Sequence, residues 1–260
     1  MSFPVYLPLG PWRVHPHLLF DLLAYFVGFR LYLAARRGRG DSLDDPRRWW
    51  VVAAAALGAA LGARVVFLLE CPAETLAHLT DAAYLLSGKT IVGGIAGGWL
   101  AVEAAKKRLG IAGRTGDLFA LPLVAAIAIG RIGCFLTGLA DHTYGVATAL
   151  PWGIDFGDGV RRHPTQLYEI LFLALLGALL VRARRRGVRE GDLFRGFAAG
   201  YFGFRLLVDF WKPAACRGLG LTSIQWVCLA ALAVCGPDIV RWLRGTETGE
   251  PGDGMVQGPR

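Results

Sequence analysis

The chain has 260 residues, of which 54% are hydrophobic and only 18% are charged, and its formal net charge is +8. An ordinary soluble domain carries about 25% charged residues, so this composition argues against a soluble enzyme and excludes a disordered or fibrous chain. Five cysteines without a CxxC spacing exclude a disulfide-dense secreted scaffold and leave no zinc-binding sequence motif. An apolar chain with surplus positive charge is typical of a bacterial membrane protein.

Apolar stretches long enough to cross a membrane recur along the chain. A hydrocarbon core of about 30 Å needs about 20 apolar residues in a helix. The pattern predicts an all-α polytopic membrane protein with seven transmembrane helices, over residues 18–35, 49–69, 91–105, 117–139, 165–182, 192–211 and 221–243. We expect residues 1–245 to form this membrane domain, and the Gly-rich, polar residues 246–260 to form a disordered tail.

The basic residues between the apolar stretches predict the orientation of the chain. Fourteen lysines and arginines follow the first, third and fifth stretches, whereas six lie in the segments that alternate with them. The positive-inside rule then places the N-terminus outside and the C-terminus in the cytoplasm, across a bacterial inner membrane. Cys71 and Cys216 fall in outer loops in this topology, where they either pair in an oxidising compartment or stay free.

Three arginines interrupt the apolar stretches. Arg64, Arg131 and Arg205 lie past the middle of the second, fourth and sixth stretches, which all run from inside to outside. A charge at membrane depth costs about 2.5–3.5 kcal/mol, so it needs a reason. The three guanidinium groups share one depth in the outer half of the bilayer, and their planar donor fork suits a phosphate. The sequence therefore predicts a polar site for a phospholipid headgroup near the outer leaflet.

Each of these arginines also has a purely structural interpretation. Arg205 and Asp209 are four residues apart on one helix and can neutralise each other. Arg64 can extend toward Glu70 or the membrane interface. Arg131 has no carboxylate nearby on its own helix, which favours a functional role for it.

Other features of the same stretches have competing structural interpretations. Paired glycines four apart favour close helix packing, and Tyr25 has the character of an aromatic residue at the membrane interface. We expect three further histidines in the outer segments to be solvated. The glycine pairs are Gly58/Gly62, Gly93/Gly97 and Gly94/Gly98, and the histidines are His15, His17 and His78.

Several segments resemble one known family. Residues 161–169, RRHPTQLYE, resemble the RHPSQLYE segment of the prolipoprotein diacylglyceryl transferases, and residues 130–135, GRIGCF, resemble their GRxGNF signature. Residues 200–209 resemble the family's pattern GYxxFR followed by an acidic residue. Tyr25 and Arg64 match its first and second helices. The resemblance runs from about residue 4 to residue 243, and the family has seven helices with the N-terminus outside.

The resemblance implies a reaction and its partners. These enzymes move a diacylglyceryl group from phosphatidylglycerol to the thiol of a lipobox cysteine in a preprolipoprotein, and glycerol phosphate leaves. The expected partners are phosphatidylglycerol, other membrane lipid and the lipobox segment, with no nucleic acid, no cofactor and no metal. By analogy, Arg131 and Arg205 are catalytic and hold the phosphate. The expected substrate-binding residues are Tyr25, Arg64, Gly97, Gly98, Gly145, Gln166, Tyr168, Glu169 and Asp209.

The chain departs from the family at positions that bear on catalysis. Ala96 replaces a histidine before a Gly-Gly pair, and Cys134 replaces the asparagine of GRxGNF. His142 and His163 are the remaining outer histidines that could serve as the general base. Cys134 either fills space or contributes a reactive thiol. These changes keep open an alternative function, a non-catalytic membrane paralogue that binds phospholipid or lipoprotein.

Overall fold

Long helices make up most of the computed structural model, which describes residues 3–39, 45–214 and 216–244. The expected tail at 246–260 lies outside the described residues. The long helices are α1 (Pro16–Arg39), α2 (Asp45–Leu68), α5 (Ile91–Arg108), α6 (Asp117–Thr137), α7 (Thr165–Arg185), α8 (Asp192–Val208) and α9 (Ser223–Leu243). Each of them overlaps one of the apolar stretches predicted from the sequence.

The prediction of an all-α membrane protein is confirmed. Five helices, α1, α2, α6, α7 and α9, are long and apolar enough to cross a membrane. Helix α8 has 17 residues, because the chain tightens into a 3₁₀ turn, η2, at Asp209–Trp211. Helix α5 has 18 residues and contains four glycines and several charges. Seven membrane crossings therefore stay a prediction for α5 and α8.

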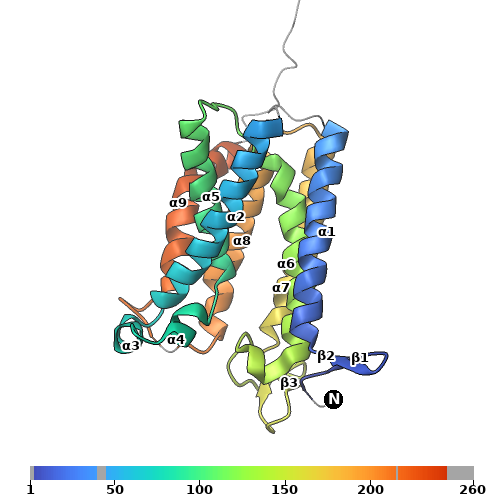
Figure 1. Cartoon of the computed structure of the whole chain (residues 1–260), viewed down its shortest axis with the longest axis vertical. Coiled ribbons are helices and arrows are strands. Elements are labelled where there is room, and N and C mark those ends of the chain that lie inside the picture. The colour runs from blue at the N-terminus through green and yellow to red at the C-terminus, as the bar shows by residue number, and fades with distance from the viewer. Residues whose placement is uncertain (1–2, 40–44, 215, 245–260) are drawn as a thin grey trace, which may run out of the picture.

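The long helices stand side by side, and successive helices run in opposite directions (Figure 1). Helix α1 packs on α6, α2 on α5, α6 on α7, and α8 on α9. The short elements gather at the lower end of the bundle in Figure 1, near the N-terminal end. They are β1 (Leu7–Leu9), β2 (Trp12–Val14), α3 (Pro72–Ala77), α4 (Ala82–Leu86), the 3₁₀ turn η1 (Gly138–Asp141), β3 (Ile154–Asp155) and β4 (Arg161–Arg162). β1–β2 and β3–β4 are antiparallel pairs.

The glycine pairs bring α2 and α5 into close contact, which confirms the packing interpretation. A Cβ atom added to Gly97 would lie 2.4 Å from the carbonyl oxygen of Gly58 and 2.7 Å from Cα of Gly62. A Cβ added to Gly93 would lie 2.3 Å from the carbonyl oxygen of Gly62. Larger side chains at these positions would force the two helices apart.

Apolar side chains line both the core and the outer surface of the bundle. Leu173, Phe197 and Cys228 are fully buried at the contacts of α7, α8 and α9. On the opposite face of α7, Leu171, Leu175 and Leu179 are exposed at helical spacing. A helix that is apolar all round fits a lipid environment, where its outer face contacts acyl chains instead of water.

A disulfide joins Cys71, just before α3, to Cys216, in the segment after η2. The two Cα atoms are 5.4 Å apart, and the linked residues are 145 positions apart in the sequence. The pairing considered from the sequence is thus present. Disulfides persist in oxidising compartments, which agrees with the predicted location of this end of the bundle outside the cytoplasm.

Candidate functional site

Two buried arginines converge on one glutamate between α6, α7 and α8. Nε of Arg131 lies 2.9 Å from Oε2 of Glu169, and Nη1 of Arg205 lies 3.6 Å from the same oxygen. All three residues are buried. Arg131 comes from α6, Glu169 from α7 and Arg205 from α8. The fold therefore gathers guanidinium groups that the sequence placed only at a common depth.

Helix direction explains why these side chains meet. Pro164 caps the N-terminus of α7, so Glu169 follows shortly after the helix begins at the lower end of the bundle. Arg131 and Arg205 lie toward the C-terminal ends of α6 and α8, which run the opposite way. Proline suits a helix start because its missing N–H has no partner to lose there. The three side chains thus reach one level near the lower end.

A second set of contacts holds the carboxylates and the arginines in place. The Tyr201 hydroxyl donates to Oε1 of Glu169 at 2.7 Å. Nη2 of Arg205 lies 3.5 Å from Oδ1 of Asp209, which confirms the pairing considered from the sequence. The Thr222 hydroxyl, at the start of α9, donates to Oδ2 of Asp209 at 2.6 Å. Sequence reasoning assigned no role to Tyr201, although it lies four residues before Arg205 on the same helix face.

Several buried polar atoms of this site have no hydrogen-bond partner among the described residues. Apart from Nε of Arg131 and Oε2 of Glu169, which face each other at 2.9 Å, they are both amide atoms of Gln166 and Nε of Arg205. Gln166 is only 1% exposed, and it lies one turn before Glu169 on α7. Buried polar groups in native proteins are nearly always satisfied. These atoms therefore indicate a place for a polar ligand.

Three more of the predicted site residues, Gly145, His163 and Tyr168, lie together beside the start of α7. Nδ1 of His163 lies 3.1 Å from the Tyr168 hydroxyl, which also accepts a hydrogen bond from Nε1 of Trp152 at 2.8 Å. The Gly145 N–H donates to the His163 carbonyl at 2.8 Å. A Cβ on Gly145 would lie 2.8 Å from the carbonyl oxygen of Trp211, so only glycine fits without a shift.

Other predicted site residues do not join this cluster. Tyr25 is 71% exposed on α1, as an aromatic residue facing lipid would be. Arg64 donates to the carbonyl of Gly88 at 2.8 Å, so it ties α2 to the segment before α5. His142 is exposed, and its ring lies beside that of Tyr144. Gly97 and Gly98 serve the packing of α5 on α2.

Lys212 is a further cation near the cluster, and sequence reasoning missed it. It follows η2 directly and is half-buried. Burial lowers the pKa of Lys212 to about 7, and the charges of Arg205 and Arg131 act in the same direction. Glu70 also faces this region, and burial together with the charge of Asp209 raises its pKa.

The expectation that His17 is solvated was wrong. Its side chain is 29% exposed and lies between two carboxylates, with Nδ1 3.0 Å from Oδ1 of Asp141 and Nε2 3.3 Å from Oδ2 of Asp21. Gly133 allows α1 to approach α6 here, since a Cβ on Gly133 would lie 3.3 Å from Cα of His17. The close packing of these two helices partly buries a histidine that hydropathy alone places in solvent.

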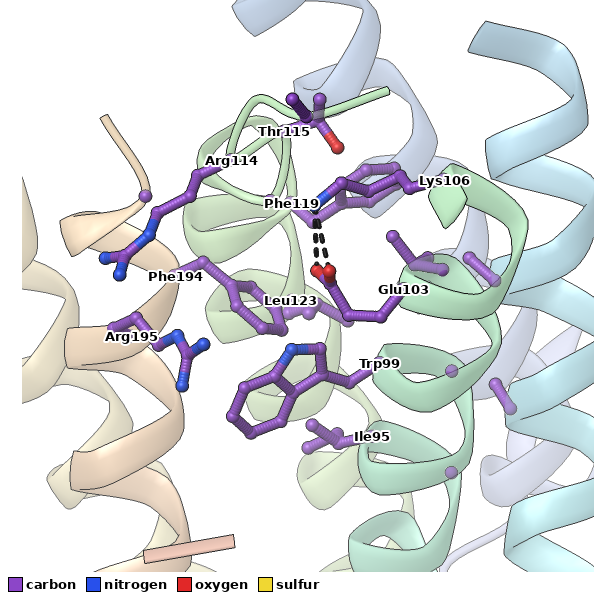
Figure 2. A pocket seen from close by; sticks show the side chains of 18 residues that line it. Ile95, Trp99, Glu103, Lys106, Arg114, Thr115, Phe119, Leu123, Phe194 and Arg195 are labelled. Atoms are coloured by element: carbon purple, nitrogen blue, oxygen red, sulfur yellow. Dashed lines mark hydrogen bonds and ion pairs between the residues drawn. The ribbon is translucent and has the colours of Figure 1, made fainter. Parts of the chain in front are cut away.

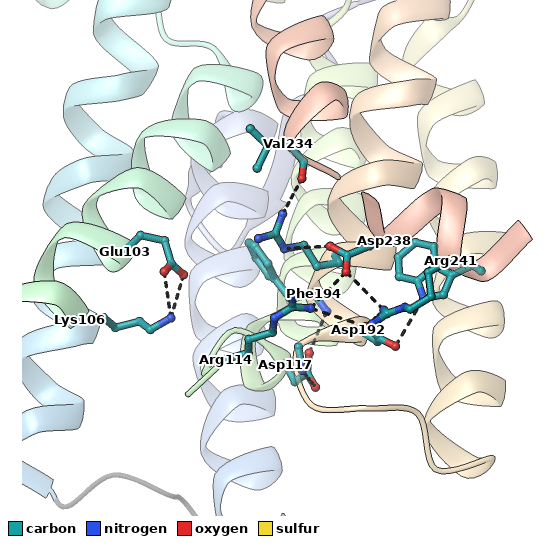
Figure 3. A network of polar contacts seen from close by, with 12 residues as sticks. Glu103, Lys106, Arg114, Asp117, Asp192, Phe194, Val234, Asp238 and Arg241 are labelled. Atoms are coloured by element: carbon teal, nitrogen blue, oxygen red, sulfur yellow. Dashed lines mark hydrogen bonds and ion pairs between the residues drawn. The ribbon is translucent and has the colours of Figure 1, made fainter. Parts of the chain in front are cut away.

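A pocket of about 320 Å³ lies at the other end of the bundle, between α2, α5, α6 and α8 (Figure 2). Its cations already have partners. Lys106 contacts Glu103 at 3.0 Å, and Arg114 contacts Asp238 at 3.2 Å. Figure 3 shows Arg114 joined with Asp192, Asp238 and Arg241 in a network of ion pairs. This pocket therefore suits an anionic ligand less well than the Arg131–Arg205 cluster.

Comparison with known proteins finds one family profile and several relatives that match most of this chain. The family profile described as prolipoprotein diacylglyceryl transferase matches residues 4–238. A phosphatidylglycerol–prolipoprotein diacylglyceryl transferase of Bordetella bronchiseptica is 34% identical over 249 residues, covering 87% of this chain and 90% of the relative. A protein of the same name from Geobacter sulfurreducens is 35% identical over 228 residues, covering 83% and 85%. One from Vibrio vulnificus is 30% identical over 265 residues, covering 92% and 90%.

Proposed function

Because the chain belongs to the prolipoprotein diacylglyceryl transferase family, we propose that it transfers a diacylglyceryl group from phosphatidylglycerol to the thiol of a lipobox cysteine. The reaction breaks the bond between the glyceryl carbon and the phosphate oxygen and forms a thioether. The electron pair of the broken bond leaves on glycerol phosphate. The enzyme must therefore bind a phosphodiester, stabilise the charge that develops on it, and present a thiolate.

The convergence of Arg131 and Arg205 on Glu169 carries this proposal. A guanidinium group stays charged and offers planar donors that match phosphate oxygens. In a buried site these donors act with little screening by water. Arg131 and Arg205 would hold the phosphate of the lipid and, in the transition state, the charge on the leaving group.

The remaining contacts assign supporting roles. Glu169 and Asp209 balance the two arginines in the absence of substrate and fix their orientation, which avoids uncompensated buried charge. Gln166 offers a free amide for the glycerol hydroxyls of the headgroup. Gly145, His163 and Tyr168 lie together beside the start of α7. His163 is better placed than the exposed His142 to act on a substrate beside Glu169, because it belongs to the same segment.

We place the site in the outer half of the inner membrane, open to the outer leaflet. The disulfide lies at the same end as the cluster, and the arginine-rich connections lie at the other end. Both observations agree with an N-terminus outside and a cytoplasmic C-terminus. Phosphatidylglycerol and a translocated lipobox segment would both reach the cluster from this side.

Complementation tests the proposal. A bacterium depleted of its own transferase should regain growth and lipid-modified lipoproteins when it expresses this chain, and Arg131→Ala should fail although it inserts into the membrane. Arg195→Ala is the matched control, since Arg195 is an arginine at the opposite end of α8. Failure of the unaltered chain at normal membrane levels would favour a non-catalytic lipid-binding or lipoprotein-binding role instead.

A further inference from the structure

Three side chains with metal-binding atoms meet beside Arg131. His17 comes from the first turn of α1, Cys134 from the last turn of α6, and Asp141 from the end of η1. One ligand atom from each lies within 4.8 Å of the other two. Nη1 of Arg131 lies 3.7 Å from Sγ of Cys134, so this group adjoins the candidate phosphate site. No sequence spacing predicts the group, because His17 is far from the other two in the chain.

The facing atoms of His17 and Asp141 are close enough together to share one ion. Nδ1 of His17 lies 3.0 Å from Oδ1 of Asp141. Two ligands at about 2.0–2.1 Å from a tetrahedral zinc ion are about 3.3 Å apart. The spacing of the two atoms is therefore close to that of neighbouring zinc ligands.

The surrounding contacts orient two of these three ligands. Nε2 of His17 lies 3.3 Å from Oδ2 of Asp21, and donation from Nε2 leaves the lone pair of Nδ1 free for a metal. The Thr143 hydroxyl donates to Oδ2 of Asp141, the oxygen that does not face His17. Ligating histidines and carboxylates are generally held by such outer hydrogen bonds.

We propose that His17, Cys134 and Asp141 bind a zinc ion, and that its fourth position receives the thiolate of the substrate cysteine. A thiolate, an imidazole and a carboxylate favour zinc over magnesium or calcium. Three protein ligands with one open position are typical of catalytic rather than structural zinc sites. The side chain of His17 is 29% exposed while that of Asp141 is 7% exposed, so the group is accessible from one side.

This inference rests on the proposed function and supplies a step that the function needs. Coordination to zinc deprotonates a thiol, and the proton leaves to water at the outer surface. The sulfur lone pair then forms the bond to the glyceryl carbon, while the phosphate beside Arg131 takes the electron pair of the breaking C–O bond. No oxidant or reductant is involved. A bound thiolate would also make a base unnecessary at the position that Ala96 occupies.

Metal binding can be tested without any transfer assay. The purified full chain, washed with chelator and reloaded with Co²⁺, should bind one ion and develop the charge-transfer band of a cobalt–thiolate bond. Cys134→Ser should remove the band, and His17→Ala should weaken Zn²⁺ binding at least about 100-fold, since loss of outer-shell partners alone costs 10–100-fold. Cys228→Ser and His15→Ala are the matched controls and should bind as the unaltered chain does.

The substrate position needs a second measurement. A lipobox peptide with cysteine should shift the cobalt spectrum, and the same peptide with serine should not. Equal metal binding by the unaltered chain and Cys134→Ser would overturn the site and leave His17 as an ion pair between two carboxylates. Full transfer by chelated protein would overturn the thiolate role while the proposed function stands. Stoichiometric metal with a peptide-dependent shift, but no transfer in any lipid, would support the site and contradict the function.

Discussion

Nε of Arg131 lies 2.9 Å from Oε2 of Glu169, and both side chains are almost wholly buried between α6 and α7. The same oxygen is 3.6 Å from Nη1 of Arg205. One carboxylate thus compensates two guanidinium groups in a region where a lone charge is costly. Stability and activity are coupled at Glu169, because the carboxylate that allows the two arginines to be buried also fixes the orientation of their guanidinium groups.

We expect Glu169→Gln to destabilise the protein by about 3–5 kcal/mol, the range for breaking a buried ion pair from one side. The amide keeps the shape and can still accept from Tyr201, but it leaves the two arginines without their shared counter-charge. Unfolding in detergent, followed by heat or denaturant, measures the change. Asp158→Asn provides the comparison, because Asp158 pairs with Arg162 at 2.7 Å in the exposed turn between β3 and β4. That substitution should cost much less than Glu169→Gln, since ion pairs at the surface contribute little to stability.

The glycine contact between α2 and α5 predicts a steric effect. Gly97→Ala would place a Cβ 2.4 Å from the Gly58 carbonyl oxygen, and we expect a loss of about 1–3 kcal/mol of unfolding free energy. Gly203→Ala, in α8, meets nothing within 4 Å and should be neutral or stabilising by up to about 1 kcal/mol. If both substitutions shift the unfolding midpoint equally, the packing argument for Gly97 is wrong.

The Cys71–Cys216 disulfide should stabilise the outer end of the bundle. Removing a native disulfide typically costs about 2–5 kcal/mol, so reductant should lower the unfolding temperature of the unaltered chain. The double variant Cys71→Ser/Cys216→Ser should have the lower temperature already and ignore reductant. Alkylation of the unfolded, non-reduced chain should label Cys134, Cys228 and Cys235 and leave the other two unmodified.

Lys212 predicts a pH dependence of stability. Its folded-state pKa of about 7 lies below the ordinary 10.5, so between these values the unfolded chain binds more protons. The contribution of Lys212 to stability therefore rises with pH from about 7 to 10.5. Below pH 7 Lys212 is charged in both the folded and the unfolded state, so the full cost of burying its charge opposes folding. Lys212→Met should stabilise the protein most at pH 6 and progressively less toward pH 10. A difference in unfolding temperature that does not change with pH would contradict this assignment.

The sequence was sufficient to predict the long helices. Each long helix coincides with an apolar stretch to within a few residues, since hydropathy and helix length are local properties. The convergence of Arg131 and Arg205 on one carboxylate was only implied. It depends on how α6, α7 and α8 pack, which a single sequence does not encode in any local pattern.

The errors and omissions also have physical causes. His17 was expected in solvent, because nothing in the sequence reveals that Gly133 lets α1 pack tightly against α6. Tyr25 stays a predicted substrate-binding residue, and its exposure on α1 sets it apart from the buried arginines. Lys212 follows a helix that ends earlier than its hydropathy suggests, so its position beside the arginines became visible only in the fold.

The most direct test of the central claim is transfer in proteoliposomes that contain phosphatidylglycerol and a lipobox peptide, with mass spectrometry to detect the added diacylglyceryl group. Arg205→Ala should lower the transfer rate at least about 100-fold, as expected when a donor to developing charge is removed. Arg195→Ala, from the opposite end of the same helix, should retain the rate of the unaltered chain. Equal rates for Arg205→Ala and the unaltered chain would contradict a phosphate site built on Arg131, Arg205 and Glu169.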